Sequence, residues 1–330
     1  MNIVSVKQRW PKNKLRVELM LGNVCNYSCW YCFPGSNEGT DRWPDYKILS
    51  TNLKHLFNYY KCIGKDIFEI HLIGGEPTLW ADLGEFVKEL KAEHNCIISM
   101  SSNGSRTLRW WQEYGEYFDK VLLSAHYEKI DTDHYISVAD CLYKQKVIVT
   151  GLVLMDPSNW DTCMHVVEKL KTSKYRWGID VQEILLHNKT VNYTEDQRKI
   201  LKKHRLRSAN PIWFLLNNKH TILHTTVTHD TGTSSVIKNN EIVLNKWNQF
   251  KGWDCNLGID SIYINPKGVL TGACGNYLYN LNYNFNLRSI EFVEKFNPKI
   301  TTTICQQENC YCQPEANLSK HKIISIIKVD

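Results

Sequence analysis

The order of hydrophobic and polar positions predicts strands that alternate with helices over residues 1–205. Short apolar or alternating runs predict six strands, at residues 15–22, 67–75, 96–104, 120–127, 146–155 and 181–188. Apolar positions three and four residues apart predict helices at about residues 45–62, 79–94 and 160–172, and a Trp-rich helix after residue 104. This alternation predicts an α/β fold, a partial (βα)6 TIM-like barrel with functional groups at the C-terminal ends of its strands.

The pattern changes after about residue 206, where Thr, Asn and His become frequent. The segments WFLLNNKHTILH (213–224) and VIKNNEIVLN (236–245) predict short β-hairpins, and the tail HKIISIIKV (321–329) predicts a closing strand. We therefore expect three parts. They are the barrel over residues 1–205, a bridging β-hairpin or loop region over 206–250, and a small Cys-rich domain over 251–330.

Composition narrows the class of protein. The 330-residue chain has 43% hydrophobic residues, which is enough for a buried core. No apolar run reaches the roughly 20 residues of a membrane span, and the start MNIVSVKQRWPKNK lacks a secretion signal, so we expect a cytoplasmic protein with no membrane association. A net charge of +6 is mild, and no specific nucleic-acid partner is expected. Twelve cysteines in such a chain indicate metal ligands rather than disulfides.

Cys25, Cys29 and Cys32 form a C-x3-C-x2-C run in the loop after the first predicted strand. Three thiolates at this spacing can hold one face of a [4Fe–4S] cluster and leave its fourth iron open to a small chelating ligand. The alternatives are a zinc knuckle and three unrelated cysteines. Zinc requires a fourth Cys or His nearby, and none follows Cys32 at a finger-like spacing, so the cluster is the favoured interpretation.

A C-x3-C-x2-C loop after the first strand of a βα barrel resembles the radical SAM superfamily. The resemblance implies that the open iron binds the amino and carboxylate groups of S-adenosylmethionine (SAM). It implies that one-electron reduction then cleaves the C–S bond, and that the resulting 5′-deoxyadenosyl radical abstracts a substrate hydrogen. It also implies that Tyr31, between the last two cysteines, packs near the adenine.

The motif Gly74-Gly75-Glu76-Pro77 ends the second predicted strand and resembles the superfamily's GGE motif, which contacts the methionyl amino group. Glycines let the backbone approach a ligand closely, and a carboxylate accepts a charge-assisted hydrogen bond from an ammonium. The alternative is an ordinary strand-to-helix turn with an acid at a helix N-terminus. The position of the motif, one strand after the cysteine loop, favours the functional interpretation.

Other polar or small residues follow the ends of the later predicted strands. The candidates are Ser102 and Asn103 for the ribose and carboxylate of SAM, Ser124 and His126 for cofactor or substrate, Gly151 for close approach of the adenine, and His187 for the substrate. Each has an ordinary alternative, namely a common turn, a hydrogen-bonded structural histidine or simple packing. Beyond the cluster no catalytic residue is assigned, and Ser124, His126 and His187 are the candidates.

A second group of cysteines lies near the C-terminal end. Cys255 and Cys274 bracket a predicted β-hairpin, and Cys305, Cys310 and Cys312 follow in CQQENCYC. They resemble the SPASM or twitch extensions of some radical SAM enzymes, although the hairpin pattern is one residue long and five cysteines replace the seven of a full SPASM set. The resemblance implies one auxiliary [4Fe–4S] cluster, with the choice among the last three cysteines open. A structural zinc site is the alternative.

The motifs do not identify the substrate, because members of the superfamily share radical generation and little else. The leading expectation is modification of a peptide or protein side chain. The alternative is a small molecule such as a nucleotide, sugar or amine, because the barrel begins by about residue 15 and no N-terminal peptide-recognition domain is expected. An alternative of another class is a non-catalytic zinc or iron–sulfur protein. A low-potential electron donor such as flavodoxin or ferredoxin is the implied partner.

Overall fold

The computed structural model describes residues 2–8, 11–175, 177–184, 191–207, 224–238, 241–310 and 316–323. Its chain divides into two compact units. Unit 1 comprises Met1–Glu18, Lys47–Glu69 and His220–Asp330, and unit 2 comprises Leu19–Tyr46 and Ile70–Lys219. Strands β2 (Lys14–Met20) and β3 (Ile67–Ile73) contribute residues to both units. The three-part division predicted from the sequence stays a prediction.

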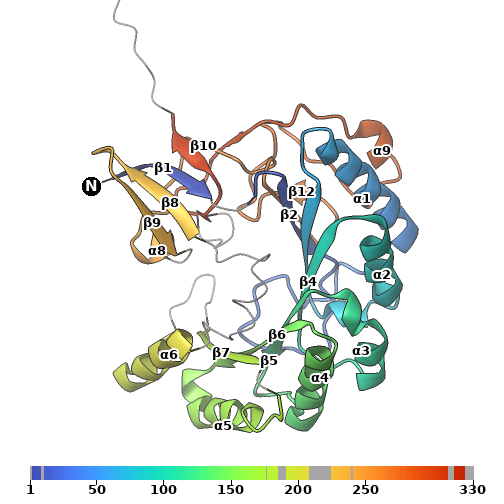
Figure 1. Cartoon of the computed structure of the whole chain (residues 1–330), viewed down its shortest axis with the longest axis vertical. Helices are drawn as coiled ribbons and strands as arrows, with labels where there is room; N and C mark the ends of the chain where they lie inside the picture. The colour runs from blue at the N-terminus through green and yellow to red at the C-terminus, as the bar shows by residue number, and fades with distance from the viewer. Residues whose placement is uncertain are drawn as a thin grey trace, which may run out of the picture. The chain divides into compact units, whose positions relative to one another are not determined.

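Unit 2 is built on a parallel sheet. After β2 and β3 the strand order is β4 (Cys96–Ser102), β5 (Lys120–Ala125), β6 (Ile148–Met155) and β7 (Gly178–Glu183), and the pairs from β4 to β7 are parallel. The intervening helices are η1 (Pro77–Leu79), α2 (Leu83–Glu93), α3 (Leu108–Tyr114), η2 (Gly115–Tyr117), α4 (Thr132–Lys144), η3 (Pro157–Asn159), α5 (Trp160–Leu170) and α6 (Glu195–Arg207). Figure 1 shows α2 to α5 on one side of these strands.

The two faces of this sheet differ in chemistry. Alternate residues of β4 to β6 are buried, and they are mostly aliphatic, as expected for a face covered by amphipathic helices. We call the opposite, partly exposed face the inner face. Its residues in β4 to β7 are Ile97, Ser99, Ser101, Lys120, Leu122, Ser124, Ile148, Thr150, Leu152, Leu154, Asp180 and Gln182. Half or more of them are polar, so this face is suited to contact water or a polar ligand.

The predicted α/β class and the six alternating strands are confirmed, and five of the six predicted strands agree with β2 to β6 within a few residues. The sixth was predicted at residues 181–188, whereas β7 spans Gly178–Glu183 and residues 185–188 lie outside the described part. The sequence analysis did not predict α4, although Asp131 caps it and its buried residues recur at helical spacing.

Unit 1 contains a second sheet, with strand order β13-β10-β14-β1-β8-β9 and antiparallel pairing. Its strands are β1 (Ile3–Gln8), β8 (His224–His229), β9 (Ser234–Lys238), β10 (Trp253–Cys255), β13 (Thr303–Ile304) and β14 (Lys320–Lys322). The hairpin of β11 (Ser261–Ile264) and β12 (Leu270–Thr271) and the helices α1 (Tyr46–Lys61), α8 (Glu241–Leu244) and α9 (Phe292–Lys295) complete the elements named here. No helix in the described residues is long and apolar enough to cross a membrane.

One of the predicted hairpins is wrong. The segment 236–245 is not a hairpin, because β9 ends at Lys238 and α8 begins at Glu241. The hairpin is formed instead by β8 and β9, around the turn at residues 230–233. Residues 213–223 lie outside the described part, so the other predicted hairpin stays a prediction. The predicted hairpin between Cys255 and Cys274 is confirmed as β11 and β12, and the start of the predicted closing strand is β14, which pairs with β1 and β10.

Candidate functional site

A cavity of ≈ 280 Å³ lies at the C-terminal ends of β3 to β6 in unit 2. Loops between strands and helices gather at this end of a βα fold, which is why such cavities hold ligands. Its lining residues are Cys25, Tyr27, Cys29, Tyr31, Cys32, Phe33, Asn37, Gly74, Gly75, Glu76, Ser101, Ser102, Asn103, Ser124, His126 and Leu154.

The three cysteines lie on the loop between β2 and α1. Asn23 holds the base of this loop, because its amide donates to the Gly35 carbonyl and the Thr40 hydroxyl, both at 2.9 Å, and its Oδ1 accepts from the Asp41 amide at 2.7 Å. Burial raises the pKa of the thiols of Cys25, Cys29 and Cys32. Iron ligation requires thiolates, so cluster binding must release protons from all three.

Gly74 and Gly75 are required by the cysteine loop itself. Both have positive φ, at 103° and 45°. A Cβ on Gly74 would lie 2.3 Å from the Gly22 carbonyl oxygen, and one on Gly75 would lie 2.0 Å from that of Val24. No side chain fits at these distances. The close approach predicted for these glycines is therefore made by the chain's own loop, which the double glycine holds against the end of β3.

The Glu76 carboxylate is buried and accepts four hydrogen bonds. Oε1 accepts from the Thr78 amide at 3.1 Å, the Thr78 hydroxyl at 2.6 Å and the Ser102 hydroxyl at 2.7 Å. Oε2 accepts from the Asn103 amide at 2.6 Å. Burial raises the pKa of Glu76, and these four donors act against that rise. The acid thus joins the end of β3 to the end of β4.

The Asn103 side chain extends this network to the cysteine loop. Its amide donates to Asn26 Oδ1 at 2.9 Å, and Asn26 in turn donates to the Ser105 hydroxyl at 2.9 Å. Asn26 follows Cys25 directly. The chain of contacts from Glu76 through Asn103 to Asn26 therefore fixes the backbone beside one of the predicted iron ligands.

His126, after β5, contacts the cysteine loop. Its Nδ1 lies 3.1 Å from the Tyr31 hydroxyl and 3.4 Å from Cys29 Sγ, and its ring stacks on that of Tyr31 with centroids 5.8 Å apart. Burial lowers the pKa of His126 to about 4. A neutral imidazole therefore lies beside Cys29, where it can hydrogen-bond to the sulfur or to a ligand in the cavity.

A carboxylate that the sequence analysis missed ties the ends of β5 and β6 together. Asp156 Oδ2 accepts from the Tyr127 hydroxyl at 2.7 Å and from the Asn159 amide at 3.1 Å, and Oδ1 accepts from the Ser158 amide at 2.8 Å. The hydrogen bonds from Tyr127, Ser158 and Asn159 outweigh burial, which acts in the opposite sense, and lower the pKa of Asp156. The sequence contains a feature that could have predicted this role, because Asp156 is an acid followed by proline at the end of a predicted strand.

Most of the predicted site residues line this cavity at the C-terminal ends of β3 to β6. Those that do are Cys25, Cys29, Tyr31, Cys32, Gly74, Gly75, Glu76, Ser102, Asn103, Ser124 and His126. Pro77 and Gly151 are not among its lining residues. At Gly151 a Cβ would lie 2.7 Å from the Trp177 ring, so the missing side chain makes room for packing. His187 lies outside the described residues.

The lining also contains residues that were not predicted, namely Tyr27, Phe33, Asn37, Ser101 and Leu154. Tyr27 and Phe33 lie within or next to the cysteine motif, so their position in the sequence could have predicted that they line the cavity. Ser101 and Leu154 lie on the inner face near the ends of β4 and β6, where strand alternation directs them toward the same mouth as Ser124.

The donor set suits an iron–sulfur cluster with an added ligand. Within the described residues, no three His, Cys, Asp or Glu side chains converge on the position of a single metal ion. The three thiols instead line one cavity together with Gly74, Gly75 and Ser102. A cubane of four irons needs its thiolates spread around a volume of this kind, and the remaining polar lining can face a ligand on the fourth iron.

The second cysteine group lies in unit 1. Cys255 ends β10 and is buried, and the Cys305 amide donates to the Trp253 carbonyl at 2.8 Å. Gln307 donates to the Cys274 carbonyl at 3.0 Å, and the Cys305 thiol donates to the Gln307 carbonyl at 3.7 Å. Cys255, Cys274 and Cys305 are thus gathered in one region. Cys310 is buried in the adjoining apolar cluster, and Cys312 lies outside the described residues.

Comparison with known proteins agrees with this site. Residues 19–170 match the family model described as the Radical SAM superfamily. The matched range includes the three-cysteine loop, the GGEP motif and the ends of β4 to β6. Residues 19–170 therefore form a domain of the radical SAM superfamily, which is a superfamily of enzymes. Membership implies SAM and a [4Fe–4S] cluster as cofactors.

Curated relatives match only part of the chain. A GTP 3′,8-cyclase from Synechococcus elongatus is 33% identical over 89 residues, which are 27% of this chain and 26% of that protein. A probable GTP 3′,8-cyclase from Sulfurisphaera tokodaii is 32% identical over 113 residues, or 33% and 34% of the two chains. One from Haemophilus ducreyi is 29% identical over 121 residues, 34% of each chain. The chain thus spans about a quarter to a third of the length of these relatives.

Two solved structures are also similar. The structure of BtrN in complex with AdoMet and 2-DOIA has a TM-score of 0.30 at 20% identity and covers 41% of this chain and 56% of BtrN. The FeFe-hydrogenase maturase HydG from Carboxydothermus hydrogenoformans has a TM-score of 0.39 at 13% identity and covers 59% of this chain and 52% of HydG.

Proposed function

We propose that Cys25, Cys29 and Cys32 hold a [4Fe–4S] cluster with an open iron and that the rest of the cavity binds SAM. When bound, this pair would supply a 5′-deoxyadenosyl radical, which abstracts a hydrogen atom from a substrate. The observation that carries the proposal is the shared cavity, because the three thiols, the double glycine and the ends of β4 and β5 line one space.

The chain's own residues would act by holding and orienting these groups. Asn103 is anchored by its backbone contact with Glu76 and its side-chain contact with Asn26, so the second N–H of its side-chain amide has a fixed position for the ribose or the carboxylate of SAM. The Ser102 hydroxyl already donates its proton to Glu76, so Ser102 would act by holding this end of β4 in place. Gly74 and Gly75 would act by holding the cysteine loop against the end of β3, so that their backbone and the three thiols line the cavity in which the methionyl group would lie. The Tyr31 and His126 rings form an aromatic wall beside Cys29 that suits the adenine.

We propose a small molecule as the substrate. The curated relatives are named for a reaction of GTP, which is a nucleotide, and this supports the small-molecule alternative over the peptide side chain that was the leading expectation. The match covers only a third or less of these relatives' lengths. GTP itself is therefore a substrate to be tested and not one to be assumed.

The second cysteine group would hold one auxiliary [4Fe–4S] cluster, with Cys255 and Cys274 as its firmest ligands and further ligands among Cys305, Cys310 and Cys312. The contacts of Gln307 with the Cys274 and Cys305 segments support a common site. A low-potential donor such as flavodoxin or ferredoxin would reduce the enzyme, and a cytoplasmic location is part of the proposal.

Replacement of Cys29 by alanine tests the proposed function. We expect anaerobically reconstituted wild-type protein to form 5′-deoxyadenosine from SAM after reduction with dithionite. Cys29→Ala should lower this formation to the background rate, because the cluster loses one of three ligands. Cys62→Ala is the matched control, since that thiol is exposed and outside both groups. Zinc in place of iron in the wild-type protein would refute the proposal and favour a structural metal site.

A further inference from the structure

His126 contacts a predicted iron ligand in a way that the proposed radical chemistry does not use. Its Nδ1 lies 3.4 Å from Cys29 Sγ and 3.1 Å from the Tyr31 hydroxyl. The Tyr31 hydroxyl also hydrogen-bonds to Cys29. The sulfur, the imidazole and the phenol thus form one hydrogen-bonded group at the wall of the cavity, which all three residues line.

The chain itself holds His126 in this position. The backbone carbonyl of His126 accepts from the amides of Lys129 and Ile130, both at 3.0 Å, in the turn after β5. Its ring stacks on Tyr31 and meets Tyr27 edge to face, with ring centroids 5.8 Å apart in both pairs. The imidazole is therefore ordered beside Cys29 before a cluster binds, and little side-chain freedom is lost on binding.

The protons of this group can be assigned from the charge of the sulfur. A cysteine that binds iron is a thiolate, which carries no proton and only accepts hydrogen bonds. A bare Nδ1 would direct its lone pair at this negative sulfur and compete with it for the Tyr31 proton. A protonated Nδ1 donates to the sulfur, and the Tyr31 hydroxyl can donate to it as well. Cluster binding therefore favours a proton on Nδ1 of His126, whether the ring is neutral or cationic.

Hydrogen bonds to the sulfurs of an iron–sulfur cluster raise its reduction potential, because they stabilise the added negative charge of the reduced state. Cys25 Sγ accepts such a bond from the backbone amide of Tyr27 at 3.3 Å, a contact that does not depend on a side chain. The contact with Cys29 comes from side chains instead. The potential of a cluster in this cavity therefore depends on which residue occupies position 126.

From this geometry we infer that His126 donates a hydrogen bond to the Cys29 sulfur of the iron-loaded protein and raises the reduction potential of the first cluster. His126 would thus be a positioning residue that acts on the cluster through one of its ligands. The inference rests on the proposed function, because it requires a cluster on the first cysteine group. It adds the side chain that brings this cluster within reach of a low-potential electron donor.

The test is a reductive titration of the anaerobically reconstituted protein without SAM, followed by electron paramagnetic resonance. SAM added afterwards should change the signal of the first cluster, because that cluster has the open iron, and this change identifies the signal to follow. His126→Leu should shift the equilibrium toward the oxidised cluster by about tenfold, which is a fall in potential of about 59 mV for one electron. His126→Asn should shift it by less than about threefold, because asparagine has nearly the shape of leucine but places an amide N–H near the position of Nδ1.

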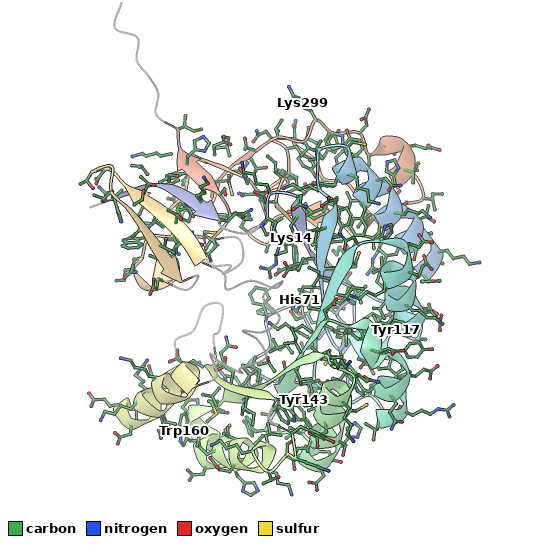
Figure 2. The ribbon with its side chains drawn as sticks, in the orientation of Figure 1. Lys14, His71, Tyr117, Tyr143, Trp160 and Lys299 are labelled. Atoms are coloured by element: carbon green, nitrogen blue, oxygen red, sulfur yellow. The ribbon has the colours of Figure 1, made fainter. Side chains whose placement is uncertain are left out.

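His71 provides the control. It is a partly exposed histidine on β3, its ring nitrogens lie 2.8 Å and 3.1 Å from the hydroxyls of Ser99 and Ser101, and it is not among the residues that line the cavity. Figure 2 shows His71 on the side of the sheet away from α2 and α3. His71→Leu should change the equilibrium of the first cluster by less than about threefold.

Three results would overturn the inference. They are a potential that does not fall in His126→Leu, an equal fall in His126→Asn, which would assign the effect to lost volume and entering water, and an equal fall in His71→Leu. Iron content and 5′-deoxyadenosine formation by the wild type are measured in parallel. A wild type without a SAM-responsive cluster would refute the proposed function itself, whereas any of the three results with an active wild type would refute the inference alone.

Discussion

At the scale of single residues, Glu76 is the clearest example of a side chain with a structural task inside a functional site. Both of its carboxylate oxygens are engaged by groups of the chain, so it orders the ends of β3 and β4 before any ligand is bound. Its role as a direct acceptor for the SAM ammonium stays a prediction. Its role in ordering the site follows from the contacts.

We expect Glu76→Gln to lower the free energy of unfolding by about 1–3 kcal/mol, because the new amide group places N–H donors against a buried donor. Urea unfolding at neutral pH measures this. Glu85→Gln is the control, since Glu85 is exposed and should change stability by less than about 0.5 kcal/mol. An unchanged unfolding midpoint for Glu76→Gln would show that the carboxylate does not hold these strand ends together.

The residues of this site could be predicted to different extents. The cysteine spacing and the GGEP motif are local, so they could be found without the fold. The sequence could not predict which part of the chain approaches Gly74 and Gly75. The backbone of residues 22–24 reaches them only after β2 and β3 pair. The contacts of His71 on β3 with Ser99 and Ser101 on β4 were missed for the same reason, since residues on two different strands carry no local signal.

At the scale of elements, the alternating pattern was sufficient for β2 to β6 because one face of each strand is buried under helices. The pattern misled at residues 236–245. There, Ile237 is buried in β9 and Ile242 in α8, and a turn and a short helix give the same apolar spacing as a hairpin. Short apolar runs cannot be assigned by periodicity alone.

Asp156 provides a prediction at this scale, because it joins the end of β5 to η3 and β6. We expect Asp156→Asn to lower the free energy of unfolding at pH 7 by about 1–3 kcal/mol. The pKa of Asp156 is lowered in the folded state, so its contribution is present above the usual value of 3.8 and is lost as the pH falls through the folded-state pKa.

The difference in stability between the wild type and Asp156→Asn should therefore shrink as the pH is lowered below 3.8. Urea unfolding at a series of pH values measures it. Asp161→Asn, an exposed acid in the first turn of α5, should show no such difference at any pH. A gap that stays constant down to the acid limit would contradict the assigned hydrogen bonds.

At the scale of the whole molecule, the chain has two cysteine groups, one in each compact unit. For the first group the sequence predicts three ligands, because Cys25, Cys29 and Cys32 are close in sequence, and the structure places all three on one cavity. The second is spread from Cys255 to Cys312, so its ligand set depends on how β10, β13 and the intervening loops fold. The sequence could indicate that this group exists but could not select its members.

Replacement of Cys274 distinguishes two clusters from one. We expect roughly eight irons per reconstituted wild-type chain and roughly four in Cys274→Ala, since three thiolates in the first group are untouched. The variant should still form 5′-deoxyadenosine in part but should not form product, because the proposed auxiliary cluster would act after radical generation. Cys141→Ala, in α4, should keep both the iron content and the activity of the wild type. Normal turnover by Cys274→Ala would mean that the second group has no catalytic role, and an unchanged iron content would mean that Cys274 is not a ligand.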